Sequence, residues 1–282
     1  MNSITVSAPA KINWRLEILG KRADGYHLLR MLNQHVELAD RVTLTVADAD
    51  SCTASVAIDG TNLALKAWLK LKERLGLDAC LHIHIDKQIP LAAGLAGGSA
   101  DAAAVLRGAV QLLQLNISQE ELLALGLSLG ADIPFCLSGG LALVEGIGEE
   151  LMPLEPARRL LVIANPGCQQ PTKAVFAACV PAVAAAKDEG REEALALAAA
   201  LGSASAAEVS ALCRNDMLAA AMSLSPQIEQ LMADFTALGL MPQLSGSGAT
   251  VFAVCDDESA AAQAVAVLKA KWPFAVACHT VM

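Results

Sequence analysis

A run of small residues at positions 94–99 constrains the fold of this chain more than any other feature. It separates an alternating, strand-like segment at residues 81–85 from an Ala-rich helical run that ends near Leu115. A Gly-rich turn between a strand and a long helix exposes backbone N–H groups at the positive end of that helix. A Cβ would hold phosphate oxygens away from these N–H groups, so a phosphate can reach them closely only where the residues are glycine. The run predicts a phosphate-binding turn, with close packing of the helix on a sheet as the alternative.

Two familiar phosphate-binding loops are excluded. The run contains no G-K-[ST], and its glycines do not have the spacing G-x-G-x-x-G. Ser99 supplies a hydroxyl that could reach a phosphate or a Mg²⁺ ion.

Composition indicates a globular protein with a large aliphatic core. The 282 residues suggest about two domains. Hydrophobic residues make up 55% and aromatic residues only 3%, so Ala, Leu, Val and Ile must fill the core. The longest uncharged window, residues 235–255, contains Pro242 and a Ser-Gly-Ser-Gly run, which make a poor membrane-spanning helix. No signal peptide opens the chain, so we expect a cytoplasmic protein.

Charge and cysteine usage exclude two further classes. The net charge of −9, without a basic block, is unfavourable for binding nucleic acid. The eight cysteines are scattered without a C-x-x-C pair, which indicates buried apolar residues rather than a disulfide or zinc framework. His82 and His84 stand at strand spacing without further ligands nearby, so we expect a polar strand face rather than a metal pair.

The periodicity predicts an α+β protein in two domains. An Asp24-Gly25 turn follows a strand in which Lys11 and Asn13 share one face. We expect a boundary in the connector at residues 151–159, which gives domains 1–155 and 156–282. Residues 181–207 are Ala-rich and weakly specified as helix. The expected strands are 12–18, 42–46, 81–85, 141–145, 160–165, 248–254 and 274–278, and the expected helices are 62–75, 102–115, 118–130, 226–238 and 258–271.

Three separated motifs resemble those of the GHMP kinases, the superfamily of galactokinase, homoserine kinase and mevalonate kinase. They are PAKIN at residues 9–13, P-x-x-x-G-L-x-G-G-S from residue 90, and LSGSGA at residues 244–249. The resemblance implies an N-terminal ribosomal-protein-S5-like nucleotide domain and a C-terminal ferredoxin-like substrate domain. It also implies an active site in the cleft between them.

Further segments resemble one branch of these kinases. They are RADGYHL at residues 22–28, LGADIPF at 129–135, NPG at 165–167 followed by Pro171 and Thr172, and Asn215 with Asp216. That branch uses Mg²⁺ and ATP to phosphorylate the 2-hydroxyl of a cytidine diphosphate-linked methylerythritol. The resemblance therefore implies a small-molecule substrate, no nucleic acid or membrane partner, and a monomer or homodimer. The alternatives are a kinase for another alcohol, such as mevalonate or homoserine, and a non-catalytic nucleotide sensor.

The resemblance assigns the chemistry to Lys11 and Asp132. Asp132 would be the base that accepts the proton of the substrate hydroxyl, although an Asp before Pro134 could simply begin a helix. Lys11 would pair with Asp132 and keep it ionised, although most strand lysines are exposed. Asn13, on the same face as Lys11, suits a polyol hydroxyl.

The resemblance also assigns binding residues. Tyr26 would stack on the cytosine and His27 would bind its edge, with Thr172 on the substrate side; a Tyr packed over a turn and a surface His are the alternative. Asn62, otherwise a helix cap, and Lys87, otherwise a loop charge, would lie at the nucleotide base, and Ser99 would contact Mg²⁺. The nucleotide-binding loop comprises Pro90, Leu91, Ala92, Ala93, Gly94, Leu95, Ala96, Gly97, Gly98, Ser99 and Ala100.

The loop departs from the family pattern at Ala92 and Ala96, where glycine is frequent. An Ala at positive φ costs on the order of 1 kcal/mol. We therefore expect negative φ at both residues and an open phosphate path. The loop at residues 245–249 would support the phosphate loop across the domain interface or contact substrate.

Overall fold

The computed structural model describes residues 2–58, 62–179 and 187–282, which form two compact units. The first unit consists of Met1–Ala10, Leu38–Ile89 and Ala96–Gly139, and the second of Lys11–Glu37, Pro90–Leu95 and Gly140–Met282. The single boundary expected between residues 155 and 156 differs from this division. The reason is that the two long N-terminal strands each contribute residues to both units.

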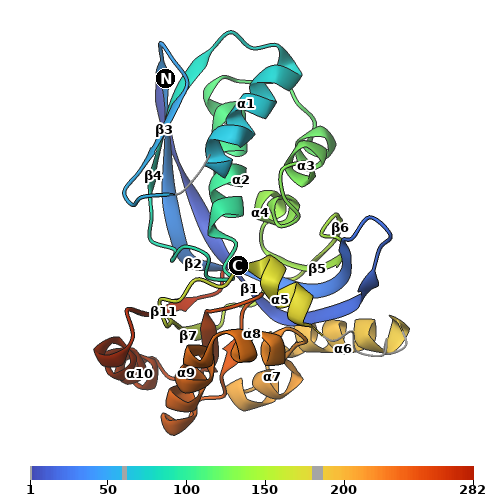
Figure 1. Cartoon of the computed structure of the whole chain (residues 1–282), viewed down its shortest axis with the longest axis vertical. Coiled ribbons are helices and arrows are strands. Elements are labelled where there is room, and N and C mark those ends of the chain that lie inside the picture. The colour runs from blue at the N-terminus through green and yellow to red at the C-terminus, as the bar shows by residue number, and fades with distance from the viewer. Residues whose placement is uncertain (1, 59–61, 180–186) are drawn as a thin grey trace. The chain divides into compact units, whose positions relative to one another are not determined.

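The first unit packs helices against strands β3-β4-β2-β1, which belong to a seven-stranded sheet that also includes β8, β5 and β6 (Figure 1). Strand β4 pairs antiparallel with β2 and parallel with β3. The elements of this unit, with the two long strands in full, are β1 (Ser3–Lys21), β2 (His27–Ala47), β3 (Ser51–Ala54), α1 (Leu63–Leu75), β4 (Cys80–Asp86), α2 (Gly97–Leu112), α3 (Gln119–Leu127) and α4 (Ile133–Ser138).

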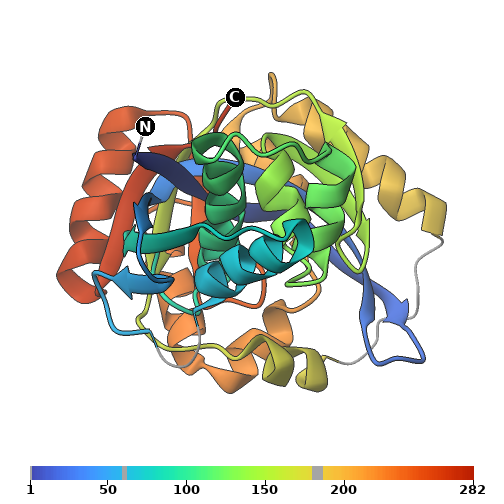
Figure 2. The same ribbon diagram turned by 90° about the horizontal axis from the view of Figure 1, so that it is seen from above.

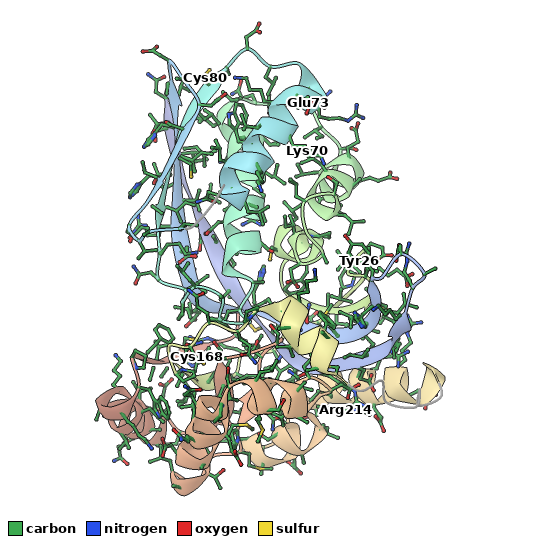
Figure 3. The ribbon with its side chains drawn as sticks, in the orientation of Figure 1. Tyr26, Lys70, Glu73, Cys80, Cys168 and Arg214 are labelled. Carbon is green, nitrogen blue, oxygen red and sulfur yellow. The ribbon has the colours of Figure 1, made fainter. Side chains whose placement is uncertain are left out.

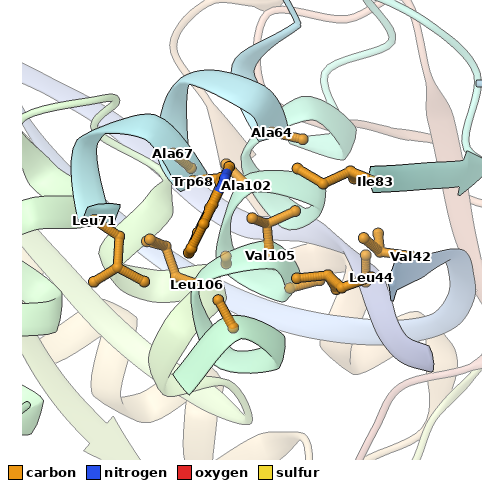
Figure 4. Packing of buried hydrophobic residues seen from close by; sticks show 14 of the residues in the cluster. Val42, Leu44, Ala64, Ala67, Trp68, Leu71, Ile83, Ala102, Val105 and Leu106 are labelled. Carbon is orange, nitrogen blue, oxygen red and sulfur yellow. The ribbon is translucent and has the colours of Figure 1, made fainter. Parts of the chain in front are cut away.

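Helix α1 begins and ends where the sequence indicates. The Asn62 side chain accepts a hydrogen bond from the Ala64 N–H, and Gly76 ends the helix with φ 62°. Its apolar face presents Trp68 and Leu71 to α2 and to the strands (Figure 4). The predicted capping box between Ser118 and Glu121 is likewise present at the start of α3.

The Ala-rich composition lets α2 lie very close to its neighbours. Ala102, Ala103 and Ala104 are fully buried. A Cβ at Gly108 would come within 2.8 Å of a Leu44 methyl group, so the Leu44 side chain packs directly against the backbone of α2.

The second unit contains a separate four-stranded antiparallel sheet of order β11-β7-β10-β9. Helix α10 packs along β11 and β7 (Figure 2). Its elements are β5 (Leu141–Gly146), β6 (Glu150–Leu154), β7 (Leu160–Asn165), α5 (Thr172–Ala178), α6 (Lys187–Ala200), α7 (Ala206–Leu212), β8 (Arg214–Asn215), α8 (Leu218–Leu224), α9 (Pro226–Ala237), β9 (Gln243–Leu244), β10 (Val251–Cys255), α10 (Glu258–Lys271) and β11 (Phe274–His279).

The expected elements are present, but α2 begins at Gly97 rather than after Asp101, and β10 begins at Val251 rather than at residue 248. Two further predictions differ from the structure. The connector predicted at residues 151–159 contains most of strand β6, which pairs antiparallel with β5 over Glu150–Leu154. The helical prediction for residues 181–207 falls partly outside the described residues, and its remainder contains α6, a non-helical turn and the first two residues of α7.

The other expectations concern cysteines, histidines and membrane segments. All eight cysteines are free. His82 and His84 bond through Nδ1 to the hydroxyls of Ser51 and Thr53, each at 2.9 Å, and no metal-binding group of three or more ligand side chains occurs among the described residues. Within the same residues, none of the helices has the length and apolar character needed to cross a bilayer.

Truncating Leu71 tests the core of the first unit. Leu71→Ala should lower the free energy of unfolding by about 2–5 kcal/mol, because it leaves a cavity beside α2. The matched control Leu69→Ala, on the same helix but 42% exposed, should change it by less than about 1 kcal/mol. Urea unfolding measures both, and equal effects would contradict the packing described.

Candidate active site

The polar face of β1 is buried from Lys11 to Glu17, and the side chains of Lys11 and Asn13 are joined by a hydrogen bond. Lys11 and Asn13 are 4% and 1% exposed, and the Lys11 Nζ donates to Asn13 Oδ1 at 2.7 Å. The shared face predicted from the alternation is therefore confirmed, and the alternative of an exposed strand lysine is wrong. A lysine is rarely buried unless its charge meets polar partners, so the position indicates a specific use.

The chain of amides extends beyond the predicted residues. Asn13 Nδ2 donates to Asn33 Oδ1 on β2 at 2.6 Å, and Asn33 is fully buried. We did not predict Asn33 from the sequence. The available signal was an amide at position 33 between the buried apolar residues of a strand.

The β1–β2 hairpin presents the predicted aromatic pair. A turn closes the hairpin, with the Arg22 N–H bonded to the Tyr26 carbonyl at 2.7 Å. Tyr26 is 58% exposed at the hairpin tip (Figure 3). The His27 ring stacks on Phe176 of α5, with ring centroids 4.5 Å apart and an angle of 13° between the planes.

The chemistry of His27 follows from its surroundings. Burial and the nearby positive charge of Lys21 lower the pKa of His27 below its ordinary value. The ring is therefore neutral near pH 7 and offers one donor and one acceptor. Phe176 was also missed by the sequence analysis, although its position four residues after Thr172 places both on one side of a helix.

The first part of the glycine-containing loop is fixed against the Ser-Gly-Ser-Gly turn. Ser245 Oγ donates to the Gly94 carbonyl at 3.0 Å, and the Thr250 N–H donates to the Ala93 carbonyl at 3.2 Å. Gly94 has φ 75°, and a Cβ there would lie 2.9 Å from the Gly248 carbonyl oxygen. The two backbones therefore meet at a distance that requires glycine. Residues 90–95 and 245–250 lie in one unit, which confirms that this turn supports the loop but not that it does so across a domain interface.

The expectation for the two loop alanines was wrong. Ala92 and Ala96 have φ of 50° and 55°, in the left-handed region. This costs on the order of 1 kcal/mol at each residue. The surrounding bonds impose the conformation: Ala93 is bound by Thr250, and the Ala96 carbonyl accepts the Ala100 N–H at 2.8 Å as α2 begins.

The second part of the loop forms the start of α2. A Cβ at Gly97 would lie 3.1 Å from Ile89 Cγ2, whereas one at Gly98 would meet nothing within 4 Å. Gly98 thus leaves backbone N–H groups accessible at the positive end of a 16-residue helix, with Ser99 beside them. This arrangement suits an anionic ligand such as a phosphate.

Lys87 is engaged by two carboxylates of the first unit. Its Nζ forms ion pairs with Asp101 of α2, at 2.7 Å, and with Asp40 of β2. Asp40 Oδ1 also accepts the N–H groups of Gln88 and Ile89 at 2.6 and 2.8 Å. Burial raises the pKa of Asp101 to about 7, and the positive charge of Lys87 offsets part of that rise. Lys87 thus anchors the segment that leads into the loop, and a contact with the nucleotide base stays a prediction.

The remaining predicted residues occupy defined places. Asn62 caps α1, which confirms its alternative role as a helix cap. Its predicted contact with the nucleotide stays a prediction. Asp132 precedes α4, but its carboxylate makes no capping hydrogen bond there. Asp132 and Lys11 belong to different units, so their predicted pairing stays a prediction.

Thr172 and Asn215 both reach the Ser-Gly-Ser-Gly turn. The Thr172 and Ser247 hydroxyls are 2.9 Å apart. Asn215 Nδ2 donates to the carbonyls of Leu244 and Gly246, each at 2.9 Å. Segments that are far apart in sequence therefore meet within the second unit.

Comparison with known families gives two matches. The chain matches the model of the GHMP kinases N terminal domain over residues 62–140 and that of the GHMP kinases C terminal domain over residues 197–273.

Curated relatives cover nearly the whole chain. A Brucella abortus protein named 4-diphosphocytidyl-2-C-methyl-D-erythritol kinase is 42% identical over 300 residues, covering 99% of this chain and 95% of that protein. A protein of the same name from Geobacter sulfurreducens is 37% identical and covers both chains fully.

Solved structures share the fold. A crystal structure of 4-(cytidine 5'-diphospho)-2C-methyl-D-erythritol kinase superimposes with a TM-score of 0.84 at 31% identity, covering 99% of this chain and 100% of that one. A homoserine kinase from Cytophaga hutchinsonii, at 20% identity and a TM-score of 0.72 over 100% of this chain and 95% of that one, shares the fold alone.

Of two glycine substitutions in the loop, only one should destabilise the protein. Gly94→Ala should lower the free energy of unfolding by at least about 2 kcal/mol, because its Cβ would meet the backbone of the Ser-Gly-Ser-Gly turn at positive φ. Gly98→Ala adds a Cβ in open space near a helix start and should leave stability unchanged within about 0.5 kcal/mol. Thermal unfolding measures both, and a tolerated Gly94→Ala would refute the close contact.

Proposed function

Because the chain belongs to the GHMP kinases, we propose that it phosphorylates the 2-hydroxyl of 4-diphosphocytidyl-2-C-methyl-D-erythritol at the expense of ATP. The products are the 2-phosphate and ADP. The names of full-length relatives at 37% and 42% identity support this substrate. As an ATP-dependent kinase the chain acts on a small molecule of the isoprenoid precursor pathway.

The glycine loop at the start of α2 carries the proposal. Gly98 leaves the helix N-terminus open, and Gly94 fixes the preceding segment against the Ser-Gly-Ser-Gly turn. The β- and γ-phosphates of ATP need several N–H donors and a positive potential, and this loop supplies both.

The transfer needs a base and a cation for the reacting oxygen. The substrate oxygen attacks the γ-phosphorus, its proton passes to the Asp132 carboxylate, and the bond to ADP breaks. Lys11, held by Asn13 at 2.7 Å, stabilises negative charge on that oxygen, and Asn13 binds a substrate hydroxyl. The transfer is direct, without a phosphoenzyme.

Magnesium enters with the nucleotide. The Ser99 hydroxyl is the protein group that suits it, and the described residues include no cluster of carboxylates for a protein-held ion. This fits an ion held mainly by phosphates and water. When bound, it neutralises phosphate charge during transfer.

The aromatic residues of the second unit favour the cytidine substrate over other alcohols. Tyr26 is exposed for stacking on a base, and the His27 ring lies against Phe176 with a neutral donor–acceptor edge. Mevalonate and homoserine have no base to stack. The presence of both Lys11 and Asp132 argues against a non-catalytic sensor.

ADP formation with a panel of alcohols tests the proposal. With Mg²⁺ and ATP we expect turnover with the cytidine substrate and none with mevalonate, homoserine or galactose. Asp132→Asn should lower kcat at least about a hundredfold while ATP still binds, because the proton acceptor is lost. Turnover with another alcohol would reject the substrate, and ATP binding without any turnover would favour the sensor.

Truncating Tyr26 tests the base-binding role. Tyr26→Ala should raise KM for the cytidine substrate about 5–150-fold, as expected for a lost stacking contact, with KM for ATP unchanged. Val267→Ala, which truncates a similarly exposed side chain on α10, should change neither KM. An unaltered substrate KM in Tyr26→Ala would contradict this role.

A further inference from the structure

We propose that Asn33 is a positioning residue that holds Lys11, acting through the amide of Asn13. The inference rests on the proposed function in one respect, namely that Lys11 and Asn13 act on the substrate. The contacts that carry it lie within the second unit and connect β1 to β2.

The direction of the hydrogen bonds follows from the chemistry of Lys11. An ammonium group only donates, so the atom of Asn13 that faces Lys11 at 2.7 Å must be Oδ1. The Asn13 amide then presents Nδ2, a donor, to Asn33 at 2.6 Å. Asn33 must in turn present Oδ1. One positive charge thereby sets the orientation of two amides in succession.

The orientation of the Asn33 amide leaves one of its own polar atoms unpaired. Asn33 Nδ2 points away from Asn13, is buried, and has no hydrogen-bond partner among the described residues. A buried unpaired donor costs about 1–3 kcal/mol. Rotating the Asn33 amide would bring two N–H₂ groups face to face and break the bond to Asn13. The amide orientation that Lys11 requires is therefore kept, although Asn33 Nδ2 is left without a hydrogen bond.

Both neighbours of Asn13 restrict it further. Asn33 sits in the β2 ladder opposite Ala142 of β5, which fixes its backbone. On the other side, a Cβ at Gly246 would lie 3.4 Å from Asn13 Oδ1, so the Ser-Gly-Ser-Gly turn packs against the amide. Asn13 thus has little room to move, and loss of the Asn33 acceptor releases its amide to rotate.

Substitutions of Asn33 separate positioning from packing. Asn33→Leu keeps the branching and the number of side-chain heavy atoms but removes the acceptor, and kcat should fall roughly tenfold with KM for ATP unchanged. Asn33→Asp keeps an acceptor for Asn13 Nδ2 and should restore most of that loss. Equal losses in both variants, or a change in KM for ATP alone, would overturn the proposal.

A double-mutant cycle tests the amide order directly. In Asn13→Asp, Asn33 can rotate and donate Nδ2 to the new carboxylate, and in Asn33→Asp, Asn13 still donates. In the double variant neither residue carries an amide donor, so a hydrogen bond between the two carboxyl groups requires one of them to take up a proton. We therefore expect the double variant to lose roughly tenfold or more kcat beyond the product of the single effects. A matching excess loss of Tm should accompany it.

The control cycle pairs Asn13→Asp with Asn165→Asp. Asn165 is a buried residue of β7 whose side-chain amide bonds to Thr250 Oγ1 and to the Gly167 N–H. The effects of Asn13→Asp and Asn165→Asp on kcat should therefore multiply, with no further loss in the double variant. Multiplicative effects in the Asn13–Asn33 cycle would overturn the proposal. If the wild-type chain turned over no alcohol, the proposed function would fail, and the Tm cycle would still decide the amide coupling.

Discussion

The close backbone contact between Gly94 and the Ser-Gly-Ser-Gly turn is the constraint on which the site depends. It holds residues 93–95 against residues 245–250, with the Ser245 hydroxyl and the Thr250 N–H each donating to a loop carbonyl. The next residue, Ala96, has positive φ and is the N-cap residue of α2. The conformation of residues 93–95 is therefore set before any ligand is present, and a preorganised loop loses less entropy on binding.

Each unit contains a chain of buried polar side chains near the predicted site residues. In the second unit Lys11, Asn13 and Asn33 form one line, and in the first Asp40, Lys87 and Asp101 form another. Burying such groups is costly unless they are paired. In each of these two sets a lysine is the positive charge that its partners face. The first set holds the Lys11 side chain, and the second holds the backbone at Gln88 and Ile89.

Local pattern was sufficient for much of the fold. Asn62 and Gly76 mark α1, alternation places Lys11 beside Asn13, and the glycine run predicts the loop between β4 and α2. These features depend on neighbours in sequence. Asn33 and Phe176 could not be found in that way, because their roles arise from strand pairing and ring stacking between distant segments. Ala92 and Ala96 were mispredicted because the bond from Thr250 to Ala93 and the first hydrogen bond of α2 at Ala96 outweigh the cost of positive φ.

Phosphorus NMR of the product tests the central claim most directly. The purified chain would be incubated with Mg²⁺, ATP and 4-diphosphocytidyl-2-C-methyl-D-erythritol, and the phosphorus atoms of the product assigned. The account predicts one new phosphomonoester on the 2-hydroxyl, an unchanged diphosphate, and one ADP per product. Release of inorganic phosphate without a new ester, or a phosphoryl group at another position, would contradict it.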